Sequence, residues 1–222
     1  VSNPFSDEYW FADPFILEVT PEYIYVLVEA MPSATQKGVI AKLTIARSSM
    51  TITDVKVILE EPWHLSFPNI MRKDGHVYVY PESAYGKKLY LYELTQEKTG
   101  KTSLKRIKTL CDDVIWDTEI SELLGGQPLL FTARHDDFYL DIYKWNDTIK
   151  RFEYSESLES PEQNMRMAGS LFEHKGIIVY PSQISTPYVY GKAVELREIS
   201  CDHGKWNLKE IRTIYPDRKS VV

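Results

Sequence analysis

The sequence predicts an all-β protein, specifically a β-propeller made of blades with four antiparallel strands each. Three observations lead to this prediction. A pair of short strands around a turn occurs four times in the 222-residue chain. The copies follow one another at about 50 residues, which is a usual length for one propeller blade. Each copy is followed by two further strand-like segments, so the repeating unit has four strands.

The first two strands of each blade form the clearest part of the repeat. In the second copy, alternating apolar residues lie on both sides of Asp74-Gly75, which is a strong hairpin signal. An apolar position in the first strand and the end of the second strand both keep the period. The first landmark is Ile16, Ile70, Ile120 and Leu171, and the second is Glu29, Glu82, Ala133 and Ser182.

The third and fourth strands complete each blade. We expect the third strand at 38–47, 88–96, 138–145 and 193–200, where apolar residues alternate again. We expect a more polar fourth strand at 54–61, 104–111, 151–158 and 206–215. These segments place blades at about 12–61, 64–112, 115–160 and 166–216 of a single domain covering residues 1–222. From the repeat alone, the chain is either a compact four-bladed wheel or four complete blades of a larger one.

Composition argues against several functional classes. A net charge of −6 and a pI near 5.5 argue against a nucleic-acid surface. Cys111 and Cys201 belong to no CxxC or Cys/His cluster, so we expect no metal, no cofactor and no disulfide scaffold. The sequence has no apolar run long enough for a membrane span and no visible signal peptide. The compartment stays open, with the cytoplasm favoured.

Polar residues gather where the first strand of each predicted blade begins. In a propeller these strands line the central channel, so residues far apart in sequence converge at one end of it. Polar groups crowded there would suit a polyhydroxylated ligand. The strand starts carry Asp13, His64, Ser66, Asp117 and Arg166, and the ends of the second strands add Glu29, Glu82 and Arg134.

Each of these residues also has a structural interpretation. Asp13 precedes Pro14 and could cap a turn, but Asp117 occupies the same place in the third blade, which favours function. Two carboxylates across a narrow channel repel each other, and the raised pKa of one would suit acid/base chemistry. Arg166 could neutralise one of them in a salt bridge, or hold an anionic or carbonyl-bearing ligand through two hydrogen bonds.

Two further positions are equally open. His64 is either hydrogen-bonded beneath Trp63 or a ligand contact. Tyr190, just ahead of the third strand of the last blade, is either a turn residue or a ligand contact.

Several motifs resemble a known family. FADPF, EEPWHLSFPNI, YPES, RMAG, YPSQ and YGKAVEL occur in this order. From about Trp10 to Tyr215 the chain resembles the N-terminal domain family of plant glucosamine inositolphosphorylceramide transferases. More remotely, it is similar to the five-bladed propeller superfamily of arabinanases, levansucrases and invertases, including glycoside hydrolase family 43. The resemblance implies five blades, the fifth incomplete here. It also implies a carbohydrate or glycoconjugate ligand and a glycosyltransferase or sugar-modifying domain as partner.

The resemblance also implies roles for individual residues. Asp13 matches the general base of family 43, and Asp117 matches the Asp that orients the general acid and tunes its pKa. The family's general acid, a Glu entering the fourth blade, is replaced here by Arg166. Glu82 is then the candidate acid, provided that the carboxyl groups stand about 6.5–9.5 Å apart, as inversion requires. Arg166 and His64 would also suit a phosphate, as in propeller glycoside phosphorylases.

Two functions remain open at this point. The first is a glycosidase-like enzyme, and the second is a non-catalytic glycan-binding or auxiliary domain that serves a sugar-transferring enzyme. A protein-interaction scaffold would not need polar residues at the repeated strand starts. The predicted catalytic residues are Asp13, Asp117 and Glu82, and the predicted ligand-binding residues are His64, Ser66, Arg166, Glu29 and Tyr190.

Overall fold

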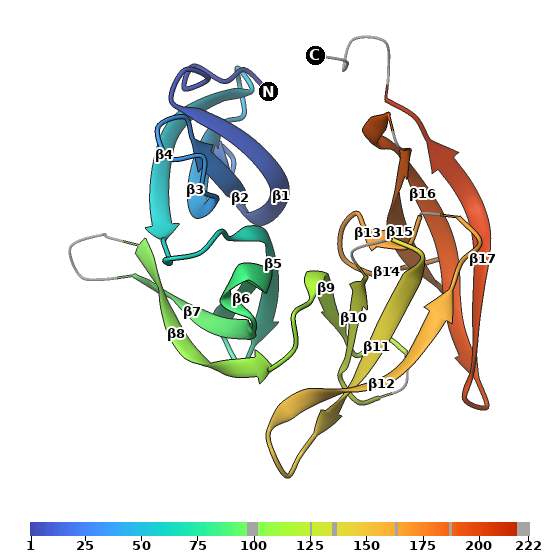
Figure 1. Ribbon diagram of the computed structural model, residues 1–222. Coiled ribbons are helices and arrows are strands. Elements are labelled where there is room, and N and C mark those ends of the chain that lie inside the picture. The colour runs from blue at the N-terminus through green and yellow to red at the C-terminus, as the bar shows by residue number, and fades with distance from the viewer. Residues whose placement is uncertain (97–101, 125, 135–136, 163, 187, 217–222) are drawn as a thin grey trace. The chain divides into compact units, whose positions relative to one another are not determined.

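The computed structural model describes residues 1–96, 102–124, 126–134, 137–162, 164–186 and 188–216, which form an all-β chain (Figure 1). Their contacts divide into two compact units, Val1–Val114 and Ile115–Val222. The first unit contains β1 (Tyr9–Val19), β2 (Tyr23–Pro32), β3 (Val39–Ala46), β4 (Thr51–Leu59), β5 (Ser66–Lys73), β6 (His76–Glu82), the 3₁₀ helix η1 (Ala84–Gly86), β7 (Leu89–Gln96) and β8 (Thr102–Cys111). The second unit contains β9 (Trp116–Ser121), β10 (Leu129–Ala133), β11 (Tyr139–Asn146), β12 (Arg151–Glu159), β13 (Arg166–Met167), β14 (Phe172–His174), β15 (Ile177–Thr186), β16 (Val189–Asp202) and β17 (Lys205–Ile214).

Each unit holds two sheets with the topology of propeller blades. Strands that follow one another in sequence pair antiparallel, in the orders β1-β2-β3-β4 and β5-β6-β7-β8 in the first unit. The second unit has β9-β10-β11-β12 and β13-β15-β16-β17, with β14 paired to β15. The predicted all-β, propeller-like arrangement of four blades is therefore confirmed. The third and fourth strands begin and end within a few residues of the predicted positions.

The strand register tests the two landmarks of the repeat. Equivalent pairs join the start of each inner strand to the end of the second strand, so the second landmark is confirmed. These pairs are Ala12↔Glu29, Ser66↔Glu82, Trp116↔Ala133 and Met167↔Ser182.

The first landmark fails in the fourth blade. Ile16, Ile70 and Ile120 stand opposite Val26, Val79 and Leu130, but the matching position opposite Val179 is Phe172 rather than Leu171. The inner strand of this blade is split into the two-residue β13 and the three-residue β14, with Gly169 at φ 151° between them. The unpaired stretch lets the chain advance by one residue, which a repeat drawn from sequence alone does not show.

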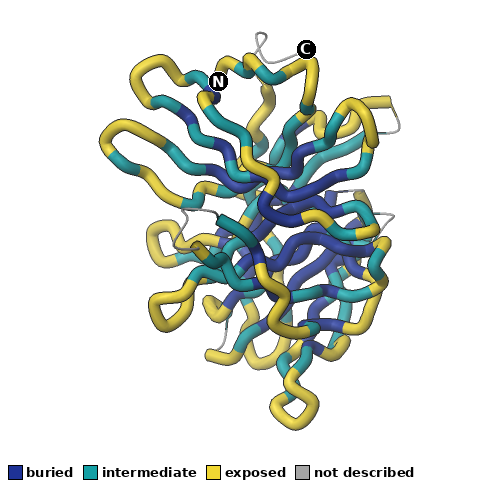
Figure 2. The backbone as a smooth tube through the Cα atoms, turned by 90° about the vertical axis from the view of Figure 1, so that its left-hand side faces the viewer, coloured by how far each residue is buried: buried dark blue, intermediate teal, exposed yellow. Residues whose placement is uncertain are grey.

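The core of the first unit lies on the two faces of the β1–β4 sheet. Leu27, Ile40 and Ile58 face the second blade and pack with Leu65 and Val79. On the other face, residues such as Val28, Ala41 and Leu43 pack with Phe5, Tyr9 and Phe11 of the N-terminal segment and β1. Figure 2 shows the same arrangement along the chain, with buried stretches in the middles of strands and exposed turns between them. The alternating apolar residues thus become two-sided blade cores, as expected for stacked sheets.

Three inner strands carry the same irregularity near their start. Asp13, Phe67 and Asp117 adopt left-handed φ values of 50°, 44° and 42°. At each of these points the register with the neighbouring strand shifts. Such bulges bend a strand and re-aim a side chain, and they are common beside functional sites. Since non-glycine residues with positive φ cost free energy, the repeated conformation must be held by its surroundings.

Candidate functional site

The predicted site residues divide between the two units. The first unit contains Asp13, Glu29, His64, Ser66 and Glu82, and the second contains Asp117, Arg166 and Tyr190. In each unit they lie at the same end of the blades, where inner strands begin, second strands end and third strands begin.

Asp13 connects the inner strands of the first two blades. Its Oδ2 accepts a hydrogen bond from the backbone N–H of Phe67, at 3.1 Å. Phe67 is itself buried and in a left-handed conformation, and its ring meets Phe15 edge to face at 5.0 Å between centroids. A carboxylate that accepts from a backbone amide is held in place, so the bulge fixes Asp13 at the start of the strand.

Glu29 and His64 form a hydrogen-bonded pair, and the sequence did not predict this contact. His64 Nε2 lies 3.1 Å from Oε1 of Glu29, whose side chain is 7% exposed. The backbone N–H of Gly38 donates to His64 Nδ1 at 3.0 Å. Because Nδ1 accepts this bond, the ring proton lies on Nε2, where it is donated to Glu29. The His64 ring is thus fixed in orientation and tautomer, which gives His64 a structural role. That His64 also contacts a ligand is a proposal.

Gly38 is required at this pair for a steric reason. A Cβ there would lie 2.4 Å from the carbonyl oxygen of Leu65, 2.8 Å from Cε1 of His64 and 2.9 Å from Oε1 of Glu29. The glycine therefore lets β3 begin directly against the imidazole and the carboxylate.

Ser66 and Glu82 face each other at the start of the second blade. They are register partners of β5 and β6, and both are buried, at 8% and 6% exposed. Phe67, which binds the Asp13 carboxylate, follows Ser66 directly. Asp13 and Glu82 are therefore both brought to the start of the same inner strand, Asp13 from β1 and Glu82 from β6.

In the second unit, Asp117 and Arg166 form a partly buried ion pair. Nε of Arg166 donates to Oδ2 of Asp117, and the two side chains are 23% and 8% exposed. Burial acts to lower the pKa of the guanidinium, but the Asp117 carboxylate and Tyr190 outweigh burial, so the pKa lies above its ordinary value. The guanidinium carbon lies 5.7 Å from the centroid of the Tyr190 ring. Of the two interpretations of Arg166, the salt bridge is present.

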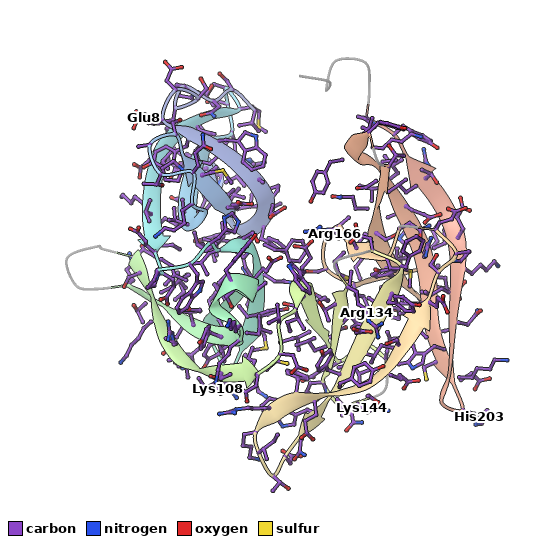
Figure 3. The ribbon with its side chains drawn as sticks, viewed as in Figure 1. Glu8, Lys108, Arg134, Lys144, Arg166 and His203 are labelled. Carbon is purple, nitrogen blue, oxygen red and sulfur yellow. The ribbon has the colours of Figure 1, made fainter. Side chains whose placement is uncertain are left out.

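Arg134, which is labelled in Figure 3, directly follows β10 and bonds within its own blade. Its Nε donates to both carboxylate oxygens of Asp141, at 3.1 and 3.0 Å, and Nη2 donates to Ser157 at 2.9 Å. Its guanidinium also lies 4.4 Å from the centroid of Tyr139. The hydrogen bond to Asp141 raises the pKa of Arg134. These contacts tie β10 to β11 and β12.

A buried polar network in the fourth blade was missed by the sequence analysis. Nε of Arg197 donates to Oε2 of Glu195 at 2.7 Å, and Nδ2 of Asn164 donates to the same oxygen at 3.0 Å. Nη1 of Arg197 also reaches Sδ of Met165 at 3.2 Å, while the Tyr180 hydroxyl donates to the Met165 carbonyl. All five residues are less than a tenth exposed. The network anchors residues 164 and 165, directly ahead of Arg166.

The sequence did contain a signal for this network. Glu195 and Arg197 lie between Ala193 and Ile199 on the same face of β16, and all four side chains are buried. A strand with a period of two places such residues together. An opposite-charge pair two residues apart between apolar positions therefore indicated a buried pair.

A surface hollow lies elsewhere in the second unit. It has a volume of about 400 Å³ and is lined by Lys144, Trp145, Asn146, Asp147, Glu153, Tyr154 and Ser155. These residues lie on and around the turn between β11 and β12, at the opposite end of the blade from Asp117. The hollow therefore contains none of the predicted site residues.

Two kinds of structural feature, a metal-binding cluster and a membrane-spanning helix, are not found among the described residues. These residues contain no group of three or more His, Cys, Asp and Glu side chains placed to hold a metal ion. Within the same residues, no helix is long and apolar enough to cross a membrane.

The chain matches a known family along nearly its whole length. Residues 1–214 match the family described as glucosamine inositolphosphorylceramide transferase 1, N-terminal. The protein of that name from Oryza sativa subsp. japonica is 26% identical over 197 residues, which are 85% of this chain and 26% of the rice protein. The Arabidopsis thaliana protein is 34% identical over 128 residues, which are 55% of this chain and 16% of that protein. This chain thus spans about a quarter or less of the curated relatives that it matches.

Solved structures of sugar-cleaving enzymes share the fold. An exo-β-1,3-galactanase from Phanerochaete chrysosporium with galactose has a TM-score of 0.65 at 8% identity, covering 95% of this chain and 53% of that one. A GH43_1 enzyme from Xanthomonas citri has a TM-score of 0.60 at 12% identity, covering 95% and 77%. A GH32 β-fructofuranosidase from Bombyx mori, in complex with sucrose, has a TM-score of 0.57 at 10% identity, covering 90% and 52%.

Proposed function

We propose a sugar-handling function for this chain, which belongs to the family of glucosamine inositolphosphorylceramide transferase 1 N-terminal domains. Its ligand in this proposal is a carbohydrate or glycoconjugate, bound where the inner strands of the blades begin. Enzymes with this fold act on sugars according to their names, and the curated relatives are sugar-transferring proteins by theirs. Because the chain spans only part of those relatives, their whole activity is not carried over to it.

The observation that carries the proposal is a pair of carboxylates in the same unusual backbone conformation. Asp13 and Asp117 both sit on a bulge at the start of an inner strand, at φ 50° and 42°. The conformation costs free energy, of the order of 1–3 kcal/mol at each residue. Strain of this kind is concentrated at functional sites, where it aims a side chain. The equivalent bulge of the second blade carries Phe67 instead, so forming the bulge does not itself require an aspartate.

The enzymatic form of the proposal assigns a role to each carboxylate. Asp13 is the general base that activates water, and the Phe67 amide holds its carboxylate at the start of the inner strand. Glu82, which is buried at the start of the same inner strand, is the general acid. For Asp117, which is bound to Arg166 in the second unit, the role taken over from the resemblance is to orient a general acid rather than to transfer a proton itself.

A second candidate is a glycan-binding or auxiliary domain without catalysis. The observation that favours it is the Arg166–Asp117 ion pair. Arg166 stands where the resemblance predicts a general acid, and an arginine does not donate its proton near neutral pH. In this form the chain presents a sugar acceptor to a glycosyltransferase or sugar-modifying partner. The five-bladed count also belongs to the proposal, because four blades are described and the resemblance implies a fifth.

A binding and turnover experiment separates the two forms. The purified chain is incubated with galactose, xylose, sucrose, glucosamine and β-1,3-galactotriose, with binding followed by NMR and cleavage by product analysis. The enzymatic form predicts cleavage of a glycosidic probe, lost in Asp13→Asn and Glu82→Gln and kept in Glu18→Gln, an exposed carboxylate on β1. Binding without cleavage supports the auxiliary form. Absence of binding to every probe, in a protein that is folded, would overturn the proposed function.

A further inference from the structure

We propose that Tyr85 and Tyr190 are two related stacking platforms, each of which receives the apolar face of a sugar ring. This inference rests on the proposed function and extends it, because it assigns Tyr85 to the site and gives both tyrosines one specific role. It concerns each unit separately.

The two tyrosines belong to similar short motifs that occur in two blades. In the second blade the strand end Tyr80-Pro81 is followed by Tyr85-Gly86-Lys87. In the fourth blade the strand end Tyr180-Pro181 is followed by Tyr190-Gly191-Lys192. Tyr85 lies in η1, ahead of β7, and Tyr190 lies near the start of β16, so both tyrosines are found close to the start of the third strand of their blades. A shared motif at one place in two blades indicates a shared requirement.

Both side chains are exposed at the end of the blade where the candidate residues lie. Tyr85 is 75% exposed and Tyr190 is 71% exposed, whereas Tyr80 and Tyr180 of the same motif are fully buried. Packing therefore explains the first tyrosine of each motif and does not explain the second. An exposed aromatic ring offers an apolar surface on which a ligand can pack.

The turn that carries Tyr85 is rigid. Ser83 and Ala84 are buried, the Ser83 hydroxyl donates to the Lys88 carbonyl at 2.5 Å, and the N–H groups of Gly86 and Lys87 donate back into the turn at 2.8 and 2.9 Å. A Cβ on Gly86 would lie 2.6 Å from Cε2 of Trp63, so the turn lies directly on the indole. A ring presented on a fixed backbone loses little further freedom when it binds a ligand.

Each exposed ring stands beside a polar candidate residue of its own unit. The Tyr85 ring lies 6.1 Å from the His64 ring, at 64° between the planes, and His64 is bound to Glu29. The Tyr190 ring lies 5.7 Å from the Arg166 guanidinium, which is bound to Asp117. In each unit, an exposed aromatic ring therefore lies next to hydrogen-bonding side chains.

This combination matches the chemistry of a sugar ring. A pyranose has one face of C–H groups and an edge of hydroxyls, so it can lay the C–H face on an aromatic ring while hydroxyls bond to adjacent polar side chains. The electron-rich face of a tyrosine attracts polarised C–H groups. The ligand class is a neutral sugar ring, since the Arg166 guanidinium is already paired with the Asp117 carboxylate and His64 is hydrogen-bonded to Glu29.

Ligand titrations of single variants test the assignment, using the probe among galactose, xylose, sucrose, glucosamine and β-1,3-galactotriose that binds the wild-type chain. Tyr85→Ala and Tyr190→Ala should each raise the Kd about tenfold, while Tyr85→Phe and Tyr190→Phe keep it, because stacking needs the ring and not the hydroxyl. Tyr23→Ala is the control, because Tyr23 is also exposed but begins β2 at the opposite end of the first blade. Both alanine changes affect exposed side chains, so the unfolding midpoint should stay that of the wild type.

Three outcomes would overturn the inference. Unchanged affinity in both alanine variants, with binding still lost in Asp13→Ala, would refute the stacking role of the two tyrosines without refuting the proposed sugar binding. Loss in the phenylalanine variants equal to that in alanine would replace stacking by a hydroxyl hydrogen bond. If no probe binds the wild-type chain, both the proposed function and the stacking role of the two tyrosines are refuted.

Discussion

At the scale of single residues, the candidate site depends on groups that are fixed by backbone contacts. Asp13 is held by the Phe67 amide, and His64 is held between the Gly38 amide and Glu29. Residue types alone predicted that Asp13, Glu29 and His64 lie at the site end of the blades. The pairing of Glu29 with His64 was not predictable, because it depends on the close approach that Gly38 permits.

Replacing Gly38 by alanine tests this close approach. The added Cβ would meet backbone and two site side chains at 2.4–2.9 Å, so the Glu29–His64 pair must separate or β3 must shift. We expect Gly38→Ala to lower the free energy of unfolding by about 1–3 kcal/mol, as overpacking does. Urea unfolding measures the change. Wild-type stability in this variant would show that the pair is looser than described.

The two cysteines are predicted to differ in reactivity. Cys111 is 1% exposed, and burial raises its pKa from 9.0 to about 11, whereas Cys201 is exposed. Since the thiolate is the reactive form, one thiol should react with a thiol reagent at pH 8 in the native protein and the second only after unfolding. Rapid labelling of both thiols in the folded chain would contradict this.

The same shift predicts how stability depends on pH. The folded state favours the protonated Cys111 thiol, so its contribution is fully present below pH 9.0 and is lost as pH rises through about 11. Burial also raises the pKa of Tyr92 and Tyr180, which adds to the loss in alkaline solution. The free energy of unfolding, measured in urea from pH 7 to 11, should fall above about pH 9. Cys111→Ala should show a smaller fall.

At the scale of strands, the sequence predicted the elements well because apolar alternation and turn residues are local signals. It failed where pairing is broken, as in the split inner strand β13/β14, where Phe172 replaces Leu171 at the repeat position. It also did not predict the bulges at Asp13, Phe67 and Asp117, because φ depends on the neighbouring strand.

The link between β1 and β5 gives a prediction that separates structure from chemistry. Asp13→Ala leaves the buried Phe67 N–H without its acceptor and should cost about 1–3 kcal/mol in unfolding free energy. Asp13→Asn keeps an acceptor oxygen and tolerates the left-handed conformation, so it should be close to wild type in stability while losing any base function. Equal destabilisation by both changes would contradict the role given to this hydrogen bond.

The buried pair on β16 predicts a non-additive effect. Arg197→Met leaves Glu195 buried with Asn164 but without its cation, which should cost about 3–5 kcal/mol. The double variant Glu195→Leu/Arg197→Met removes both charges and should recover most of that loss. Urea unfolding of both variants and of Glu195→Leu completes the cycle. A double variant as unstable as the sum of the two single ones would show that the residues act independently.

At the scale of the whole chain, the repeat predicted the four blades and the end of each blade that carries polar residues. It did not reveal Tyr85, although its motif is a copy of the one containing Tyr190. The exposure of Tyr85 depends on a turn packed against Trp63, and such packing is not encoded in any local pattern. The buried network around Glu195 was missed because its partner Asn164 precedes the blade's inner strand.

The central claim is that sugars bind where the inner strands of the blades begin. The most direct test is a crystal structure of the protein soaked with galactose, xylose, sucrose, glucosamine and β-1,3-galactotriose. The account predicts a sugar ring in the first unit with hydroxyls bonded to Asp13 or Glu82 and its C–H face on Tyr85, or one in the second unit bonded to Arg166 with its C–H face on Tyr190. Sugar found only in the hollow beside Trp145, or at no defined place, would contradict it.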